Sequence, residues 1–138
     1  LDALRRLKEA GLTVVVLVIL GLPGETGEDM LETVRFLGRL NNPSIDGIKL
    51  QLLHVLKGTE LCRLYEREPF HVMEPEEYFS LIADCIRLLP PHIVIHRISG
   101  DGPKSLLEAP LWSGNKRFVL NSIAKTLRET GAFQGEWA

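Results

Sequence analysis

The chain has 138 residues, of which 45% are apolar and 25% charged, the composition of an ordinary globular domain with one core. Its formal net charge of −2 gives no overall attraction for nucleic acid or anionic lipid, so we expect no nucleic-acid partner unless a local basic patch exists. The longest apolar stretch, residues 12–22, is about half of the ~20 residues that a membrane-spanning helix needs, so we expect no membrane partner.

The first expected elements are a helix over residues 2–10 and a strand over residues 13–20. Leu4 and Leu7 recur at helical spacing, and Gly11 stands where a helix C-cap is common. Residues 13–20 are almost continuously apolar and rich in β-branched side chains, which is typical of a strand covered on both faces in a parallel sheet. We therefore expect a core strand here.

A glycine-rich turn, residues 21–26, follows that strand and leads into a second helix. Thr26 and Asp29 have the spacing of a capping box, which predicts a helix over residues 28–40. A turn over residues 41–44 should then lead to a second strand.

The second strand is expected over residues 45–54, where polar and apolar residues alternate. Successive side chains of a strand point to opposite faces. Lys49 and Gln51 should therefore share one face, and the other face should carry Ile48, Leu50 and Leu52.

The rest of the chain continues the alternation and then becomes helical. The expected elements are a short helix over 61–66, a helix over 75–89 that starts at Pro75, a strand over 93–98, a short helix over 103–108, and a longer helix that Ser113 caps and Gly131 ends. Strands and helices that alternate in this way are typical of repeated βα units with a parallel sheet. The predicted fold class is therefore α/β.

Two cysteines, Cys62 and Cys85, are too far apart in sequence for a CxxC or CxxxCxxC motif, so we expect no metal site in this chain. A disulfide is possible in principle. Two free structural thiols in a reducing cytoplasm fit the cysteine-poor composition better, so we expect a cytoplasmic location.

In βα folds the ligand site lies at the carboxyl ends of the strands, which points to residues 21–26, 54–59 and 99–103. Gly21 and Gly24 would allow a ligand to approach the backbone closely, and the following helix N-terminus would offer free N–H groups. On spacing alone, a tight turn whose acidic residues complement the helix dipole is the favoured interpretation of this pattern. A non-catalytic binding module or a phosphate-binding α/β enzyme would use the same glycine-rich loop.

Five polar residues on or after the later strands are candidates for contacting a substrate: Lys49, Gln51, His54, His96 and Asp101. Lys49 would be costly inside a barrel unless it binds an acidic ligand or meets a carboxylate such as Asp101. Each histidine fits a structural role as well as a catalytic one. Asp101, between two glycines, also fits a turn-forming role.

A solvated helix face explains the basic residues Lys116, Arg117, Lys125 and Arg128 better than an RNA-binding patch does.

Four blocks in one order resemble the YhcC-type group of bacterial radical S-adenosylmethionine (SAM) proteins. They are GLPGET (21–26), GIKLQLLHVLKGT (47–59), HRISGDGP (96–103) and APLWSGNK (109–116). The resemblance extends over residues 1 to about 125. It implies a partial parallel (β/α) TIM-type barrel, with barrel units over residues 1–102 and a helical C-terminal extension over 103–138 packed on the same core.

The resemblance also implies the cofactors of that family. Such enzymes hold a 4Fe-4S cluster on a CxxxCxxC loop, cleave SAM and abstract hydrogen from a substrate, which is unknown here. Neither cysteine of this chain matches the motif, so the cluster loop is expected N-terminal to Leu1, and the chain alone is expected to be inactive. The residues expected to contact SAM are Gly21, Leu22, Pro23, Gly24 and Glu25. A barrel fragment would expose the edge of its first strand, so self-association is also expected.

Overall fold

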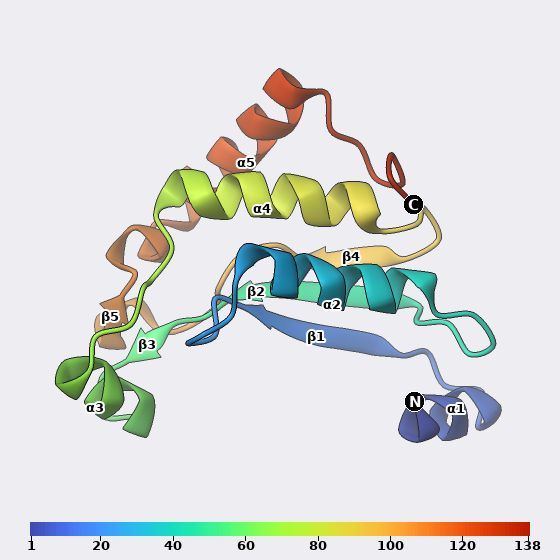
Figure 1. The fold of residues 1–138 in the computed structure, drawn as a ribbon, viewed down its shortest axis with the longest axis horizontal. Coiled ribbons are helices and arrows are strands. Elements are labelled where there is room, and N and C mark those ends of the chain that lie inside the picture. Colours follow the sequence, from blue (N-terminus) through green and yellow to red (C-terminus); the bar gives the residue numbers. More distant parts are fainter.

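The computed structural model describes residues 1–138. Its elements alternate between helix and strand along most of the chain (Figure 1). In order they are α1 (Asp2–Glu9), β1 (Val15–Leu20), α2 (Gly27–Arg39), β2 (Gly47–Leu52), β3 (Val55–Leu56), α3 (Glu60–Arg67), α4 (Pro75–Leu88), β4 (Val94–Arg97), the 3-10 turn η1 (Lys104–Leu106), β5 (Leu107–Ala109), the 3-10 turn η2 (Leu111–Gly114) and α5 (Lys116–Thr130).

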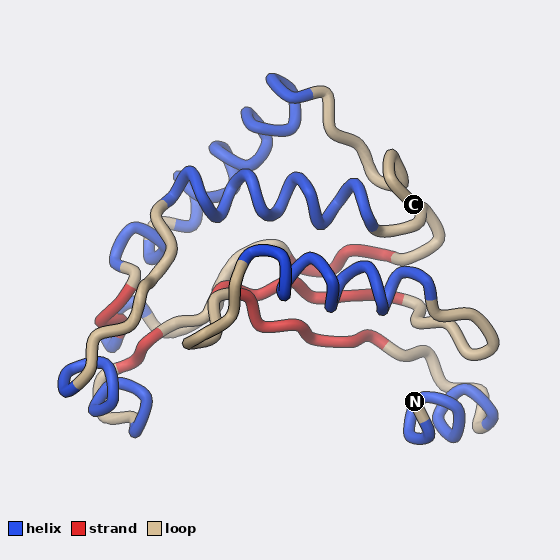
Figure 2. The backbone as a smooth tube through the Cα atoms, in the orientation of Figure 1, coloured by secondary structure: helices blue, strands red, loops and turns tan.

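Three parallel strands form the main sheet, in the order β1-β2-β4. Helices α2 and α4 both lie on one side of it, and no helix covers the middle of the opposite side (Figure 2). This opposite side is called the open face below. The parallel α/β sheet predicted from the sequence is confirmed, and within this chain the sheet stays open rather than closing into a barrel.

The central strand β2 divides its side chains as the alternation predicts. Ile48, Leu50 and Leu52 are buried beneath the helices. Lys49 and Gln51 are half-buried and belong to the open face. Burial of a large aliphatic side chain contributes about 1.5–3 kcal/mol, so this register is strongly fixed.

The expectation that β1 is covered on both faces is wrong for this chain. Val18 and Leu20 are buried beneath the helices, whereas Leu17 and Ile19 are 49% and 37% exposed. Leu17 pairs with Lys49, and Ile19 pairs with Gln51, so both lie on the open face. A continuously apolar strand does not by itself reveal which of its faces has a covering layer.

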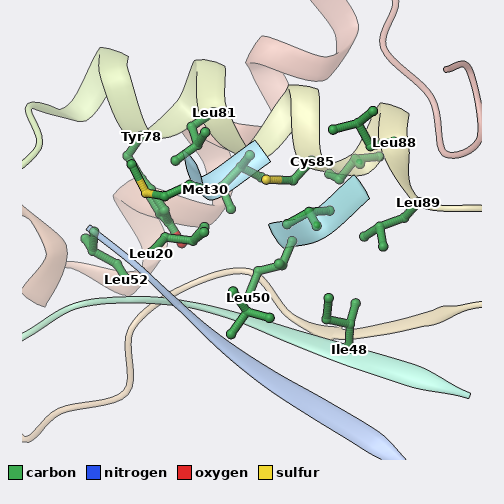
Figure 3. Close-up of a cluster of buried hydrophobic side chains, with 14 of the residues drawn as sticks. Leu20, Met30, Ile48, Leu50, Leu52, Tyr78, Leu81, Cys85, Leu88 and Leu89 are labelled. Atoms are coloured by element: carbon green, nitrogen blue, oxygen red, sulfur yellow. The ribbon is translucent and has the colours of Figure 1, made fainter. Parts of the chain in front are cut away.

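The core lies between the sheet and the helices (Figure 3). Helix α4 contributes more residues to it than any other element, including Tyr78, whose hydroxyl donates to the Ile98 carbonyl oxygen at 2.7 Å. Helix α5 packs against α4 and adds Val119 and Ile123 to the same core. The C-terminal tail returns to α4, where the Trp137 ring lies 4.6 Å from the Arg87 guanidinium. The extension after residue 102 thus shares the core of the sheet.

A second, antiparallel sheet was not predicted. Strands β3 and β5 pair through Val55 with Ala109 and Leu56 with Leu107. The prediction of a short helix over residues 103–108 is therefore wrong for its last two residues. The chain forms one 3-10 turn, η1, and then continues as strand β5. The pairing joins the loop after β2 to the C-terminal extension.

Several helix ends are as predicted, because their signals are local. Thr26 and Asp29 form the expected capping box, and Gly131 ends α5 in the left-handed conformation with φ 68°. Gly11 ends α1 with φ 78°. No helix here is both long enough and apolar enough to cross a bilayer.

The residue that caps the N-terminus of α5 differs from the predicted one. Asn115, not Ser113, is the N-cap residue, and its side-chain oxygen accepts from the Phe118 N–H at 3.1 Å. Ser113 lies within η2, where its hydroxyl donates to the Pro110 carbonyl oxygen at 2.7 Å. The hydroxyl is thus committed to the preceding turn.

One edge of the sheet is free, because β1 pairs only with β2. Beside that edge runs an apolar groove of about 410 Å³, whose lining includes residues 16–20 of β1 and Met30, Phe36 and Leu37 of α2. Unpaired backbone groups next to apolar side chains favour pairing with another chain.

We predict that the chain self-associates through this edge as its concentration rises. Ile19→Lys should weaken the association, because a charged side chain on an edge strand opposes pairing with a second strand. Sedimentation velocity over a range of concentrations measures this. Leu120→Lys, at an exposed apolar position of α5, is the matched control. A monomer at every concentration would contradict the prediction.

Candidate functional site

The carboxyl ends of β1, β2 and β4 meet at one edge of the sheet, where parallel α/β folds bind ligands. Two surfaces are found there. One is a pocket beneath the glycine-rich loop, between α2 and α4. The other is the open face of the sheet. The predicted site residues divide between these two surfaces.

The glycine-rich loop turns through two residues that need glycine. Gly21 has φ 94° and Gly24 has φ 84°, in the left-handed region that other residues rarely adopt. The Gly21 N–H points to the Met30 sulfur at 3.1 Å, and the Glu25 N–H donates to the Leu22 carbonyl oxygen at 3.1 Å. The loop is therefore held by its own backbone and by the first turns of α2.

The pocket beneath this loop has a volume of about 720 Å³. Of the five residues predicted to contact a cofactor, Gly21, Leu22, Gly24 and Glu25 line it and Pro23 does not. Its lining also includes carboxylates from three parts of the chain: Glu25, Glu28, Glu77 and Asp84. Glu28, Glu77 and Asp84 already pair with Arg35, His71 and Arg87. Glu25 is therefore the lining carboxylate that is free to attract a cationic group of a ligand.

Two backbone N–H groups at the N-terminus of α2, which could otherwise bind an anion, already donate to side chains of the same helix end. The Asp29 N–H donates to Thr26 Oγ1 at 3.1 Å, and the Asp29 carboxylate accepts from the Thr26 N–H at 2.8 Å. This hydrogen bond from the Thr26 backbone lowers the pKa of Asp29. The helix end therefore already carries a carboxylate, which further disfavours a bound phosphate.

The open face carries a cluster of polar side chains from β2 and β4. The sequence predicted the members on β2 but missed the one on β4. Lys49 and Gln51 lie there as predicted, and Arg97 of β4 is the register partner of Lys49. Arg97 Nη1 is 3.5 Å from Gln51 Oε1, and Arg97 Nη2 is 3.2 Å from Asp101 Oδ2. Arg97 was missed because a β-bulge opposite Ile48 and Lys49 interrupts the simple alternation of β4.

Asp101 does not pair with Lys49, which was one of the two alternatives for that lysine. Its carboxylate accepts from Lys116 Nζ at 2.7 Å and pairs with Arg97. The Lys116 hydrogen bond and the nearby Arg97 charge lower the pKa of Asp101. Lys116 was expected on a solvated helix face and instead belongs to this network. Lys49 has no ion-pair partner among the residues of the chain.

His54 makes hydrogen bonds within the protein through both ring nitrogens, an environment that favours the structural role. Its Nδ1 accepts from the Gly102 N–H at 3.1 Å, so in the neutral ring the proton is on Nε2. Nε2 lies 2.9 Å from Ser113 Oγ, whose own proton goes to the Pro110 carbonyl oxygen. Burial lowers the pKa of His54. Both ring nitrogens are thus occupied by hydrogen bonds within the protein.

The two glycines beside Asp101 make room for this ring. A Cβ on Gly100 would overlap the His54 ring, and a Cβ on Gly102 would lie 2.7 Å from its Nδ1. Neither position therefore tolerates a side chain while His54 is in place. The Gly-Asp-Gly sequence fits His54 below it and exposes the Asp101 carboxylate to Arg97 and Lys116.

His96 lies on β4, away from the His54 network. A Cβ on Gly47 would come within 2.7 Å of the His96 ring, so the ring lies over Gly47 on the neighbouring strand. His96 is exposed and makes no side-chain hydrogen bond within the chain. It is therefore available to a ligand, unlike His54.

Comparison with known proteins relates this architecture to one family. Residues 45–129 match the family model described as the radical SAM C-terminal domain. The chain is 37% identical to the protein YtqA of Bacillus subtilis, over 99% of the chain and 41% of that protein. It is 35% identical to the protein YhcC of Escherichia coli, over 90% of the chain and 39% of that protein.

A solved structure has the same fold. An archaeal Elp3 from Methanocaldococcus infernus, with an N-terminal deletion, superposes with a TM-score of 0.78 over 95% of the chain and 31% of the Elp3 chain. At 22% identity, this likeness concerns the fold alone. The chain spans about two fifths of the length of the bacterial relatives that it matches.

We predict that Gly100→Ala destabilises the chain by about 1–3 kcal/mol, the usual cost of overpacking a filled site. In a His54→Ala background the cost should fall below half of that value, because the overlapping ring is gone. Urea unfolding followed by tryptophan fluorescence measures both. Gly27→Ala, where an added Cβ meets nothing within 4 Å, is the control. An equal cost in both backgrounds would show that Gly100 is not constrained by His54.

We also predict that His54 makes the chain less stable below pH 6.5. The pKa of His54 is lowered in the folded state from an ordinary value of 6.5. As the pH falls through 6.5, the unfolded chain therefore binds a proton that the folded chain does not, and the free energy of unfolding decreases. The decrease cannot exceed about 1.4 kcal/mol per pH unit, the limit for one proton.

The measurement is urea unfolding at pH 7.5 and pH 5.5, a window in which the carboxylates stay ionised. In His54→Gln the difference between the two pH values should be smaller than in the unmodified chain. The other three histidines are present in both proteins, so their contribution cancels. An unchanged difference would rule out His54 as its source.

Proposed function

The chain belongs to the radical SAM C-terminal domain family, and from that premise we propose that it forms the ligand-facing part of a longer radical SAM enzyme. The observation that carries the proposal is the family match over residues 45–129, which includes the polar strands and the loops after them. The resemblance to YhcC-type radical SAM proteins that the sequence blocks indicated is thereby confirmed. Membership of the family is a finding, whereas the reaction and the substrate of the longer enzyme are proposals.

The residues of this chain do not fit an iron–sulfur cluster. Cys62 and Cys85 are buried on different helices, and no group of three histidine, cysteine or acidic residues could hold a metal ion. Burial raises the pKa of Cys85 to about 12, so this thiol stays protonated. We therefore propose that the cluster-binding cysteines belong to another part of the longer protein. Two buried free thiols also support the cytoplasm as its location.

The pocket beneath the glycine-rich loop fits SAM better than it fits phosphate. SAM carries a positively charged sulfonium and an ammonium group, and the pocket presents the carboxylate of Glu25, which has no ion-pair partner in the chain. Gly21, Leu22, Gly24 and Glu25 would hold SAM there, with Pro23 shaping the loop. In radical SAM enzymes, SAM and a reduced 4Fe-4S cluster together supply a 5′-deoxyadenosyl radical that takes a hydrogen atom from the substrate.

The open face supports a substrate-binding role. In a closed (β/α) barrel, one face of every strand points inward and the other face packs against the outer helices. Here α2 and α4 cover the side of Ile48, Leu50 and Leu52, so Lys49, Gln51 and Arg97 would point into the barrel. A complete barrel of this kind needs roughly 250 residues, and we propose that the longer chain supplies the remaining strands beside β1.

The alternative is a binding module or a phosphate-binding enzyme that uses the same loop. The unpaired carboxylate of Glu25 in the pocket and the carboxylate of Asp29 at the start of α2 both oppose phosphate binding there. We therefore favour the radical SAM function.

The first test is the reading frame upstream of Leu1 in the gene for the longer protein, where a CxxxCxxC motif is expected. The second is SAM binding by the longer, cluster-containing protein, measured by calorimetry. Glu25→Lys should weaken SAM binding at least about tenfold, because it reverses a charge in a pocket proposed to bind a cation.

Glu129→Lys reverses an exposed carboxylate on α5 and should leave SAM affinity unchanged. Formation of 5′-deoxyadenosine from SAM under reducing conditions gives a second readout. Full SAM affinity in Glu25→Lys would reject the loop as the contact. The lack of a CxxxCxxC motif would reject the function itself.

A further inference from the structure

The open face concentrates positive charge in a chain that is negative as a whole. Arg97 and Lys116 share a single carboxylate, Asp101, and Lys49 on the neighbouring strand has no ion-pair partner. The group therefore has a surplus of positive charge, whereas the chain has a formal net charge of −2. A local surplus of this kind attracts anions even when the whole protein repels them.

The two strand residues of this group face each other. Lys49 and Arg97 are register partners on neighbouring parallel strands, which lie about 4.8 Å apart. Like charges at facing positions repel each other and destabilise a sheet. Asp101 compensates Arg97, but Lys49 has no ion-pair partner in the chain. The arrangement therefore lowers the stability of the free chain and becomes favourable when an anion lies between the two cations.

The Arg97 side chain is also held in place. One of its terminal nitrogens lies 3.5 Å from Gln51 Oε1, and the other lies 3.2 Å from Asp101 Oδ2. Lys116 holds Asp101 in turn at 2.7 Å. A guanidinium fixed from two sides loses little conformational freedom when it binds a carboxylate or a phosphate. Its position, at the carboxyl end of β4, is where βα folds bind ligands.

We propose that Lys49 and Arg97 form an anion-binding site for a carboxylate or phosphate group of the ligand, with Gln51 and Asp101 as positioning residues. The next strand of the same face is apolar, because Leu17 pairs with Lys49 and Ile19 with Gln51. The ligand class is therefore an organic anion whose apolar body lies over β1. This inference deepens the proposed function. The anion site itself is argued from the structure, and only the identity of the ligand that carries the anion rests on the proposed function.

The test is a titration of the isotope-labelled chain with inorganic phosphate and with phenyl phosphate, followed through the backbone amide signals by NMR. Weak, millimolar binding is measurable in this way. Shifts are expected at β2 and β4 around Lys49 and Arg97, with phenyl phosphate bound several-fold more tightly than phosphate. Added salt should weaken both, because exposed charges are screened.

The variants separate charge from fold. Lys49→Met and Arg97→Met should each weaken phosphate binding at least fivefold, and Lys49→Arg should retain it. Lys125→Met removes an exposed cation of α5 and should change nothing. Retained amide dispersion shows that each variant is folded. Phosphate shifts that are confined to other parts of the chain, or that persist in both methionine variants, would overturn the site.

Measuring the SAM affinity of the longer protein shows whether the anion belongs to the substrate or to SAM. If Lys49→Met leaves SAM affinity unchanged, the site serves the substrate. If SAM affinity falls, the site serves the carboxylate of SAM. An unmodified protein that binds SAM but binds no phosphate at Lys49 and Arg97 rejects this inference alone, whereas a protein that binds phosphate here but never SAM rejects the proposed function alone.

Discussion

The alternation of side chains along β2 is the constraint on which the rest of this structure depends. Ile48, Leu50 and Leu52 face the helices and are buried, so the strand cannot slip by one residue without exposing all three. The same constraint holds Lys49 and Gln51 on the open face. One strand thus fixes both the core and the surface that we assign to ligands.

The loops at the carboxyl ends of the strands are joined to the C-terminal extension by polar contacts. His54 binds the backbone of Gly102 and the hydroxyl of Ser113, and strand β5 pairs with β3 just after His54. These contacts leave His54 no free nitrogen, whereas His96 and Lys49 remain free. Position at a strand end is therefore not enough to assign a ligand-binding role. The hydrogen-bond partners of each side chain decide it.

Features that depend on neighbouring residues could be predicted from the sequence, and those that depend on distant contacts could not. The capping box of α2, the end of α5 at Gly131 and the faces of β2 follow from local spacing. Ser113 has the local pattern of an N-cap, but its hydroxyl bonds to the Pro110 carbonyl oxygen and to His54, which is 59 residues away. Arg97 follows a bulge, where period-two reasoning fails. The exposure of Leu17 depends on a layer that no periodicity reveals.

The ion pair between Lys116 and Asp101 has a consequence for how proteins of this architecture diverge. Lys116 is the first residue of α5, outside the strands, yet it binds one oxygen of the Asp101 carboxylate while Arg97 binds the other. A substitution at the start of that helix would release Asp101 to Arg97 alone and so reduce the charge left for a ligand. In the proposed anion site, a substitution outside the sheet can thus change the charge that a ligand meets, without altering a single residue of the sheet.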